Sequence, residues 1–170
     1  MRLTPLAGLL FVAALFTSAS ASAEAAKTYP GDFQAKVAYV SDGDTITVSL
    51  PSKKTVRIRF ANVDAPEKTQ PYGLEAKAHL LSILKGQEVR ILVHETDRYG
   101  RAVAEVFFQG VNMNRYVVQH GLAYVYGRYN VDPHIVALER VAKQNRIGIW
   151  GIPDADRVYP WDYRDRMRNK

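Results

Sequence analysis

Three short stretches of this chain hold acidic and basic side chains that together could act on a phosphodiester. Asp42 and Asp44 flank a glycine, and Asp64 and Glu67 follow an alternating apolar run that ends at Pro66. The run must end there, because proline lacks the N–H that a sheet ladder needs. Oxygen ligands of this kind suit Ca²⁺ or Mg²⁺, and the chain has no Cys and no His at metal-ligand spacing to favour Zn²⁺.

Close approach of these acids would itself favour a cation. Two carboxylates about 4 Å apart repel by about 4 kcal/mol at an effective dielectric constant of about 20. If Asp44 and Asp64 meet in the fold, we expect them to take up a proton or to bind a cation. The simpler interpretation of Asp42-Gly43-Asp44 is a tight turn, because Asp and Gly are common turn residues.

The third stretch is Asp97-Arg98-Tyr99-Gly100-Arg101. The basic and aromatic residues of the three stretches, together with Tyr126 farther along the chain, match a nucleic acid. Arg59 and Arg101 carry planar guanidinium groups that fit phosphate oxygens, and a fixed donor aimed at charge that develops in a transition state contributes about 3 kcal/mol. Glu67 could take a proton from an attacking water. Tyr99 and Tyr126 could stack on bases. Taken singly, each of these side chains is also compatible with a solvated surface or, for Tyr126, with the core.

Apolar alternation predicts strands that would position these residues. The expected strands cover residues 33–40, 46–50, 55–60, 89–93 and 102–108. Helices are expected at about 73–85, 112–120 and from 132 to about 148. We therefore predict a mainly β fold with α, a five-stranded OB-fold barrel with about three helices. An open α+β sandwich is the alternative.

Two finer expectations follow from these patterns. Leu74, Ala78, Leu81 and Leu84 would form the buried face of the first helix, and Ile135, Leu138, Val141 and Ala142 that of the last. Strict alternation would also place Arg59 and Asp64 on opposite faces of one strand, so they can share a site only if the strand bulges, twists or ends between them.

The first residues have the three parts of a secretory signal peptide. Arg2 is followed by an apolar run from Leu6 to Phe16 and by small residues that end at Ala23. The run is shorter than the roughly 20 residues that a membrane-spanning helix needs. We expect an exported protein, periplasmic or extracellular, with no membrane anchor after cleavage. A buried N-terminal helix is the alternative.

The remaining chain is expected to form one domain. We divide the chain into a signal peptide (1–23), a linker (24–32), the folded domain (33–150) and a C-terminal tail (151–170), whose aromatic residues would pack on the barrel while its last residues fray. The net charge is +6 and falls to +5 when Arg2 leaves with the signal peptide. A basic domain favours polyanions such as nucleic acid. Nothing in the sequence indicates an oligomer, so we expect a monomer.

Taken together, these residues resemble the staphylococcal nuclease-like (thermonuclease) family. The resemblance extends from about residue 33 to residue 150, and its order and spacing are specific although each motif is short. The matching stretches are Val40-Ser41-Asp42-Gly43-Asp44-Thr45, Arg59 with Asp64-Ala65-Pro66-Glu67, Asp97-Arg98-Tyr99-Gly100-Arg101, Gly121-Leu122-Ala123 and Gly148-Ile149-Trp150.

The resemblance implies an OB barrel with three helices and a Ca²⁺-dependent endonuclease. Such an enzyme would cut DNA and RNA with little sequence preference and leave 3′-phosphate ends. By motif position, Asp44 and Asp64 look like the Ca²⁺ carboxylates and Ala65 like the residue that gives a backbone carbonyl ligand. Asp42 occupies a nearby acidic position of the pocket.

The same resemblance implies roles for the catalytic and nucleotide-binding residues. Glu67 falls on the general base, and Arg59 and Arg101 fall on the phosphate-binding arginines. Contacts to the nucleotide are implied for Arg98, Tyr99 and Tyr126.

Three classes of protein are compatible with the basic barrel. The leading hypothesis is an exported nuclease that acts on DNA and RNA with Ca²⁺. The alternative is a non-catalytic OB-fold module that binds nucleic acid, and a third class is an envelope or adhesion protein that binds anionic polymers. Neither alternative needs all of Asp44, Arg59, Asp64, Glu67 and Arg101, which favours the enzyme.

Overall fold

The computed structural model describes residues 29, 31–127 and 132–169. The expected signal peptide, residues 1–23, lies outside the described residues. The first strand, β1 (Asp32–Val40), begins at the last residue of the expected linker, one residue before the expected start of the domain. Among the described residues, the model contains no helix with both the length and the apolar character that a membrane crossing requires.

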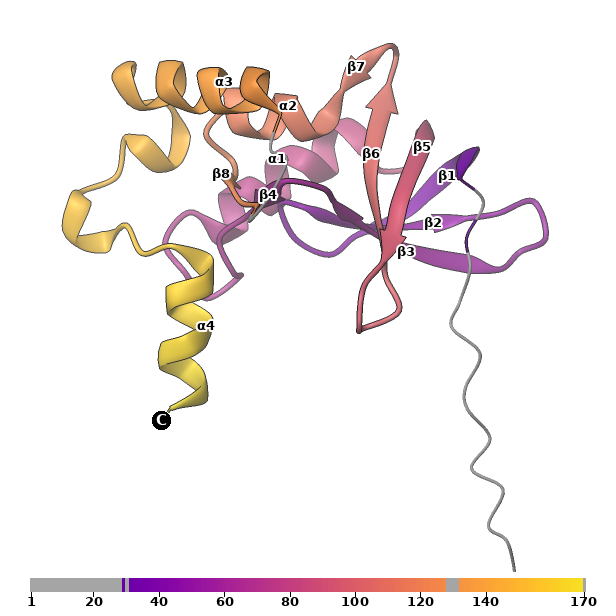
Figure 1. The fold of residues 1–170 in the computed structure, drawn as a ribbon, viewed down its shortest axis with the longest axis horizontal. Coiled ribbons are helices and arrows are strands. Elements are labelled where there is room, and N and C mark those ends of the chain that lie inside the picture. The colour runs from indigo at the N-terminus through magenta and orange to yellow at the C-terminus, as the bar shows by residue number, and fades with distance from the viewer. Residues whose placement is uncertain (1–28, 30, 128–131, 170) are drawn as a thin grey trace, which may run out of the picture.

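Five strands form a closed barrel, as the apolar alternation predicts. They are β1 (Asp32–Val40), β2 (Thr45–Ser49), β3 (Thr55–Phe60), β5 (Glu88–Thr96) and β6 (Ala102–Phe108). Their order is β3-β2-β1-β5-β6 with antiparallel neighbours, and the short β7 (Val111–Asn112) adds to β6. A parallel pairing of β3 with β6 closes the sheet (Figure 1). This closure confirms the OB-type barrel and excludes the open sandwich.

Alternate apolar residues of the strands fill the barrel. Val37, Ile46, Ile58, Phe60 and Ile91 come from four different strands and are at most 1% exposed. Full burial of such a side chain contributes about 1.5–3 kcal/mol. The barrel is therefore a packed core, and the loops at its rim are free to carry chemistry.

Two short strands that the sequence pattern did not predict lie beside the barrel. β4 (Val63–Asp64) pairs antiparallel with β8 (Tyr124–Val125). Each contains only two residues, so neither could show a period-2 pattern. This ribbon holds the chain after β3 against the segment that follows the second helix.

Within the described residues, four α-helices accompany the barrel, one more than the three expected. They are α1 (Gly73–Leu84), α2 (Met113–Gln119), α3 (Pro133–Gln144) and α4 (Pro160–Arg168), with the 3-10 helices η1 (Gly148–Trp150) and η2 (Asp154–Asp156) between the last two. The expected start of α3 is confirmed, because the Asp132 side chain accepts the His134 N–H at 2.9 Å.

The predicted buried faces of two helices need correction. Leu80 of α1 is buried, whereas Leu74 and Ala78 are exposed. A Cβ on Gly73 would lie 1.9 Å from the Glu67 carbonyl oxygen, so α1 starts in close contact with that loop and its rotation is set there. Sequence periodicity does not contain this contact. In α3, likewise, Val141 of the predicted face is 48% exposed.

The tail after the barrel is ordered as α4, so the prediction of a frayed end was wrong. Pro160 lies in the first turn of α4, where its missing N–H is no loss. The expected aromatic packing occurs, but against the β8 segment. Trp161 stacks on Tyr159 with ring centroids 4.6 Å apart and contacts Tyr126 at 5.2 Å. In Figure 1, α4 extends away from the other helices.

Two glycines of the matching stretches face each other. Gly121 and Gly148 have φ angles of 60° and 59°, which favour glycine. A Cβ on Gly121 would lie 2.2 Å from the Ile147 carbonyl oxygen, and a Cβ on Gly148 would lie 2.3 Å from that of Gly121. This close approach of two backbones places Trp150 in its buried position, 6% exposed.

Asn114 of α2 ties the helix to the closed edge of the barrel. The side chain is 3% exposed. Its amide donates to the carbonyls of Ala61 at 2.9 Å and Ala104 at 3.0 Å, and its oxygen accepts the Val106 N–H at 3.0 Å. One residue thus satisfies three backbone groups next to the β3–β6 contact.

We predict that Asn114→Ala lowers the free energy of unfolding by about 3 kcal/mol, because buried backbone groups lose their partners. Asn145→Ala is the matched control. Its side chain donates to the Val141 carbonyl on the exposed surface, and the loss should stay below about 0.5 kcal/mol. Urea denaturation followed by circular dichroism measures both, and equal losses would contradict the prediction.

Candidate active site

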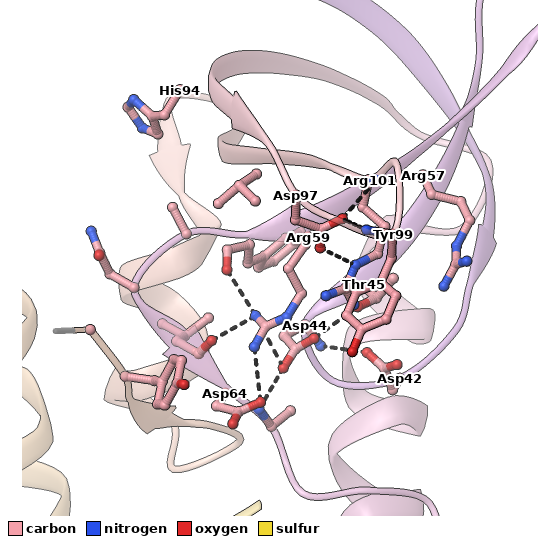
Figure 2. Close-up of a pocket in the computed structure, with 18 of the residues that line it drawn as sticks. Asp42, Asp44, Thr45, Arg57, Arg59, Asp64, His94, Asp97, Tyr99 and Arg101 are labelled. Atoms are coloured by element: carbon pink, nitrogen blue, oxygen red, sulfur yellow. Dashed lines mark hydrogen bonds and ion pairs between the residues drawn. The ribbon is translucent and has the colours of Figure 1, made fainter. Parts of the chain in front are cut away.

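A pocket of about 1100 Å³ brings the three stretches together. All ten residues that the sequence singled out line it, namely Asp42, Asp44, Arg59, Asp64, Ala65, Glu67, Arg98, Tyr99, Arg101 and Tyr126. Figure 2 shows that acidic, basic and aromatic side chains from separate loops point toward one another. Their placement agrees with the sequence analysis, and their chemical roles stay predictions.

Arg59 lies between the two buried carboxylates and contacts both (Figure 2). Its Nη1 is 3.3 Å from Asp44 Oδ2, and its Nη2 donates to Asp64 Oδ1 at 2.9 Å. Nη1 also donates to the carbonyls of Phe60 at 2.8 Å and Val63 at 2.6 Å. Asp44 and Asp64 are only 4% and 2% exposed. One cation therefore offsets the repulsion of two acids that solvent barely reaches.

The backbone around β3 explains this arrangement. Thr45 pairs with Arg59 in the β2–β3 ladder, and the Phe60 N–H donates to the Asp44 carbonyl at 2.9 Å. β3 then ends, and Asn62 turns the chain with a φ of 62° before Asp64 enters β4. Arg59 and Asp64 thus lie in two different strands. The end of the strand resolves the conflict that strict alternation raised.

Asp42 shapes the turn that presents Asp44. Its Oδ1 accepts the Asp44 N–H at 3.1 Å, and Asp44 Oδ2 in turn accepts the Ala65 N–H at 2.5 Å. Burial, together with the charge of Asp44, raises the pKa of Asp42 to about 7. Burial also raises the pKa of Asp64, opposed by the arginines that contact it. The stretch is therefore a tight turn that also lines the pocket, and its role toward a cation stays a prediction.

Glu67 is held by a tight loop but keeps an accessible carboxylate, 38% exposed. Gln70, which the sequence analysis did not single out, accepts the Glu67 N–H on its side chain at 2.8 Å and donates its own N–H to the Glu67 carbonyl at 2.8 Å. Gln70 is 5% exposed. A buried amide and the close packing of Gly73 thus aim Glu67 into the pocket.

Asp97 organises the loop between β5 and β6. Its Oδ1 accepts the N–H groups of Tyr99 at 2.9 Å and Arg101 at 3.0 Å, and its Oδ2 accepts Nε of Arg101 at 2.7 Å. Gly100 completes the turn with a φ of 71°. The stretch therefore reads as a turn whose acid orients Arg101 toward the pocket.

The predicted nucleotide-binding residues lie at the open side of the pocket. Tyr99 is 65% exposed, and its ring lies 4.9 Å from the Arg98 guanidinium. Tyr126 is 40% exposed, so it is not a core residue. Its N–H donates to the Asn62 carbonyl at 2.9 Å, which fixes it beside the turn after β3. Both rings are available to stack on bases.

Arg164 of α4 reaches the centre of the site, and sequence reasoning missed it. Its Nη2 donates to Asp64 Oδ2 at 2.7 Å, and its Nη1 donates to Glu67 Oε1 at 2.9 Å. These two carboxylates raise the pKa of Arg164 against the opposing effect of burial. The sequence shows only that the tail is basic. It does not distinguish Arg164 from the other arginines there, so the contact could not be predicted.

The donors at this site fit a hard cation. In the part of the chain that the structure describes, no cluster of three or more acidic, histidine or cysteine side chains has the arrangement of a metal site. Asp44 and Asp64 supply two carboxylates, so further ligands must come from a backbone carbonyl, as predicted for Ala65, and from water or substrate. The Arg164 guanidinium on Asp64 and Glu67 shows that these oxygens already attract a positive charge.

Comparison with known proteins agrees with this geometry. The family model described as staphylococcal nuclease homologue matches residues 57–151. An uncharacterized endonuclease of Escherichia coli O157:H7 is 43% identical over 136 residues, which cover 79% of this chain and 87% of that protein. A micrococcal nuclease of Shigella flexneri is 36% identical over 149 residues, which cover 81% of this chain and 84% of that protein.

Relatives also occur beyond bacteria. A probable staphylococcal-like nuclease of Oryza sativa subsp. japonica is 35% identical over 116 residues, covering 68% of this chain and 34% of that longer protein. The matched family region contains every predicted site residue except Asp42 and Asp44, which lie before it. This chain belongs to the staphylococcal nuclease family and is a nuclease, a hydrolase of phosphodiester bonds.

Proposed function

We propose that this nuclease is an exported, Ca²⁺-dependent endonuclease that cuts DNA and RNA with little sequence preference and leaves 3′-phosphate ends. One observation carries the proposal. A pair of buried carboxylates, an accessible glutamate and the arginines Arg59 and Arg101 line the same pocket. This combination suits a phosphodiester attacked by water.

Glu67 acts as the general base in the proposed reaction. Its carboxylate takes a proton from water as the water oxygen attacks phosphorus, and the bond from phosphorus to the 5′ oxygen breaks. The 5′ oxygen leaves as a hydroxyl by taking a proton from solvent water, the Glu67 carboxyl returns its proton to solvent, and the phosphate stays on the 3′ side. Arg101 supplies positive charge to the phosphate oxygens as their charge increases. Arg59 joins it by exchanging one of its present acceptors for the phosphate.

Asp44, Asp64 and the Ala65 carbonyl would hold the Ca²⁺. When bound, the ion would stabilise negative charge on the phosphate and orient it. Arg164 would have to release Asp64 to make room for the ion, because both carboxylate oxygens of Asp64 accept hydrogen bonds from arginines. Ca²⁺ tolerates an irregular set of oxygen ligands better than Mg²⁺ does.

The proposed cellular setting rests on the sequence alone. The basic tip, apolar run and small-residue site before Glu24 support export to the periplasm or the medium. A barrel without Cys needs no oxidising compartment to fold. We propose that the exported chain acts as a monomer.

We expect Glu67→Gln to lower kcat by about 10²- to 10⁴-fold, because the amide cannot accept the proton. The melting temperature should stay nearly the same, since the carboxylate is partly exposed. Plasmid and RNA digestion measures the rate, and Glu75→Gln on the exposed side of α1 is the control. Wild-type turnover in Glu67→Gln would refute the base assignment.

Activity should be lost in a chelator such as EGTA and return with Ca²⁺. Mg²⁺ should restore much less, because two protein carboxylates and a backbone carbonyl do not provide the near-ideal octahedron that Mg²⁺ prefers. Digestion of a plasmid with each ion at matched concentration tests this. Equal recovery with Mg²⁺ would contradict the assignment of the ion.

Arg164→Gln should lower the free energy of unfolding by about 1 kcal/mol in chelator, a modest loss because the Arg164 side chain is 41% exposed. Ca²⁺ should stabilise the variant more than the wild type, since the ion no longer competes with a guanidinium. Thermal unfolding with and without Ca²⁺ measures both effects. Arg166→Gln on the same helix is the control, and an equal Ca²⁺ response in both variants would contradict the competition.

A further inference from the structure

A cluster of three ring side chains joins α1 to α2 outside the active site. His79 of α1 lies next to Tyr116 of α2 and to His120, the residue that follows α2. The ring centroids of His79 and His120 are 5.9 Å apart, and Tyr116 and His120 stack with centroids 3.9 Å apart. None of the three residues lines the active-site pocket. The nuclease reaction therefore does not account for the two imidazoles.

We propose that His79 and His120 together bind one divalent transition-metal ion, such as Zn²⁺ or Cu²⁺, and so cross-link the two helices. Imidazole nitrogen is a favourable ligand for these ions, whereas Ca²⁺ and Mg²⁺ prefer oxygen. The two histidines are far apart in the sequence and form no metal-binding motif, so only the fold brings them together. The site is separate from the proposed Ca²⁺ site, and its test does not depend on the proposed function.

The ring of His120 is oriented as a metal ligand requires. Its Nδ1 is 2.9 Å from the Tyr116 carbonyl oxygen. A carbonyl can only accept, so Nδ1 carries the proton of the neutral ring and Nε2 keeps a free electron pair. Histidines that bind metals commonly donate one ring N–H to a carbonyl in this way, which fixes the ring and the nitrogen that binds.

His79 presents its Nε2 to the same cluster, 3.0 Å from the Tyr116 hydroxyl. The hydroxyl donates to this nitrogen when Nδ1 carries the ring proton, and an ion that binds Nε2 takes the place of that donor. Burial, and then the neighbouring His120, lower the pKa of His79. The ring is therefore mainly neutral at pH 7, the form that binds a metal.

The spacing of the two rings is close to that of a shared ion. A tetrahedral ion with bonds of about 2.0–2.1 Å places the centroids of two imidazoles about 5 Å apart. The observed 5.9 Å needs only a small shift of one ring. Two imidazoles leave the other positions of the ion to water, so the affinity should be lower than that of a structural zinc site with four protein ligands.

A metal at this position would connect two segments that support the active site. α1 begins against the Glu67 loop through Gly73, and Asn114 of α2 bonds to the closed edge of the barrel. The chain has no Cys, so no disulfide can provide such a link. An ion that binds only the folded chain stabilises it, and that stabilisation is the measurable effect.

Thermal unfolding of the full chain with added Zn²⁺ tests the site. Excess Ca²⁺ and Mg²⁺ are present throughout, so that they compete with Zn²⁺ for carboxylates. Zn²⁺ at about ten times its Kd should raise the melting temperature by about 3–6 °C. His79→Gln or His120→Gln should abolish the shift. The chain has four histidines, so His94→Gln and His134→Gln are matched controls that should keep the shift.

Cu²⁺ gives a local readout of the ligands. One equivalent of Cu²⁺ on the wild-type chain should show coupling to two imidazole nitrogens in electron paramagnetic resonance. His79→Gln and His120→Gln should each lose this signal, while His94→Gln and His134→Gln keep it. The wild-type spectrum needs no variant, so the proposal is tested even where a variant does not fold.

Two results would overturn the proposal. A wild-type melting temperature that does not respond to Zn²⁺ would mean that His79 only ties α1 to α2 through its hydrogen bond with Tyr116. A shift of equal size in all four histidine variants would place the ion elsewhere on the chain. Loss or retention of cleavage in these variants does not enter the decision, so the proposed function is judged separately.

Discussion

The contact of one guanidinium with two buried carboxylates is the constraint on which this site depends. Asp44 lies just before β2 and Asp64 in β4, and Arg59 contacts both of them. Two acids at 4% and 2% exposure would otherwise repel each other in a medium that screens poorly. The β2–β3 register and the turn at Asn62 place all three groups together, so a local error in either would separate the acidic pair.

Closure of the barrel adds the third stretch. The parallel pairing of β3 with β6 puts Arg59 opposite Val103, so the loop just before β6 lies beside the acidic pair. Asp97 then turns that loop so that Arg101 lines the pocket. A rigid barrel that carries its functional residues on rim loops is a common solution, because the scaffold fixes positions that the loops alone could not. The same logic holds for Glu67, which a buried Gln70 and the start of α1 position.

The C-terminal helix links the reaction to the substrate. The Arg164 guanidinium neutralises part of the negative charge that a bound cation would neutralise. The neighbours of Arg164 on α4 extend the pocket into a groove. If Arg164 released the Asp64 oxygens, its guanidinium would be free to contact a phosphate where the pocket joins the groove. The proposed Ca²⁺ site and this extension of the pocket therefore meet at Arg164, in a segment that the sequence alone presented only as an aromatic, basic tail.

Local patterns in the sequence determined much of this protein. Alternation predicted the five strands, because side chains in a barrel point in and out with a period of two. The acidic, basic and aromatic residues of three motifs, together with the family resemblance, predicted the ten residues that line the pocket. Only the tertiary structure decided the rotation of α1, the two-residue strands β4 and β8, and the roles of Gln70 and Arg164. Each of these depends on a contact between segments that are distant in the chain or on a backbone approach, and neither leaves a periodic signal in a single sequence.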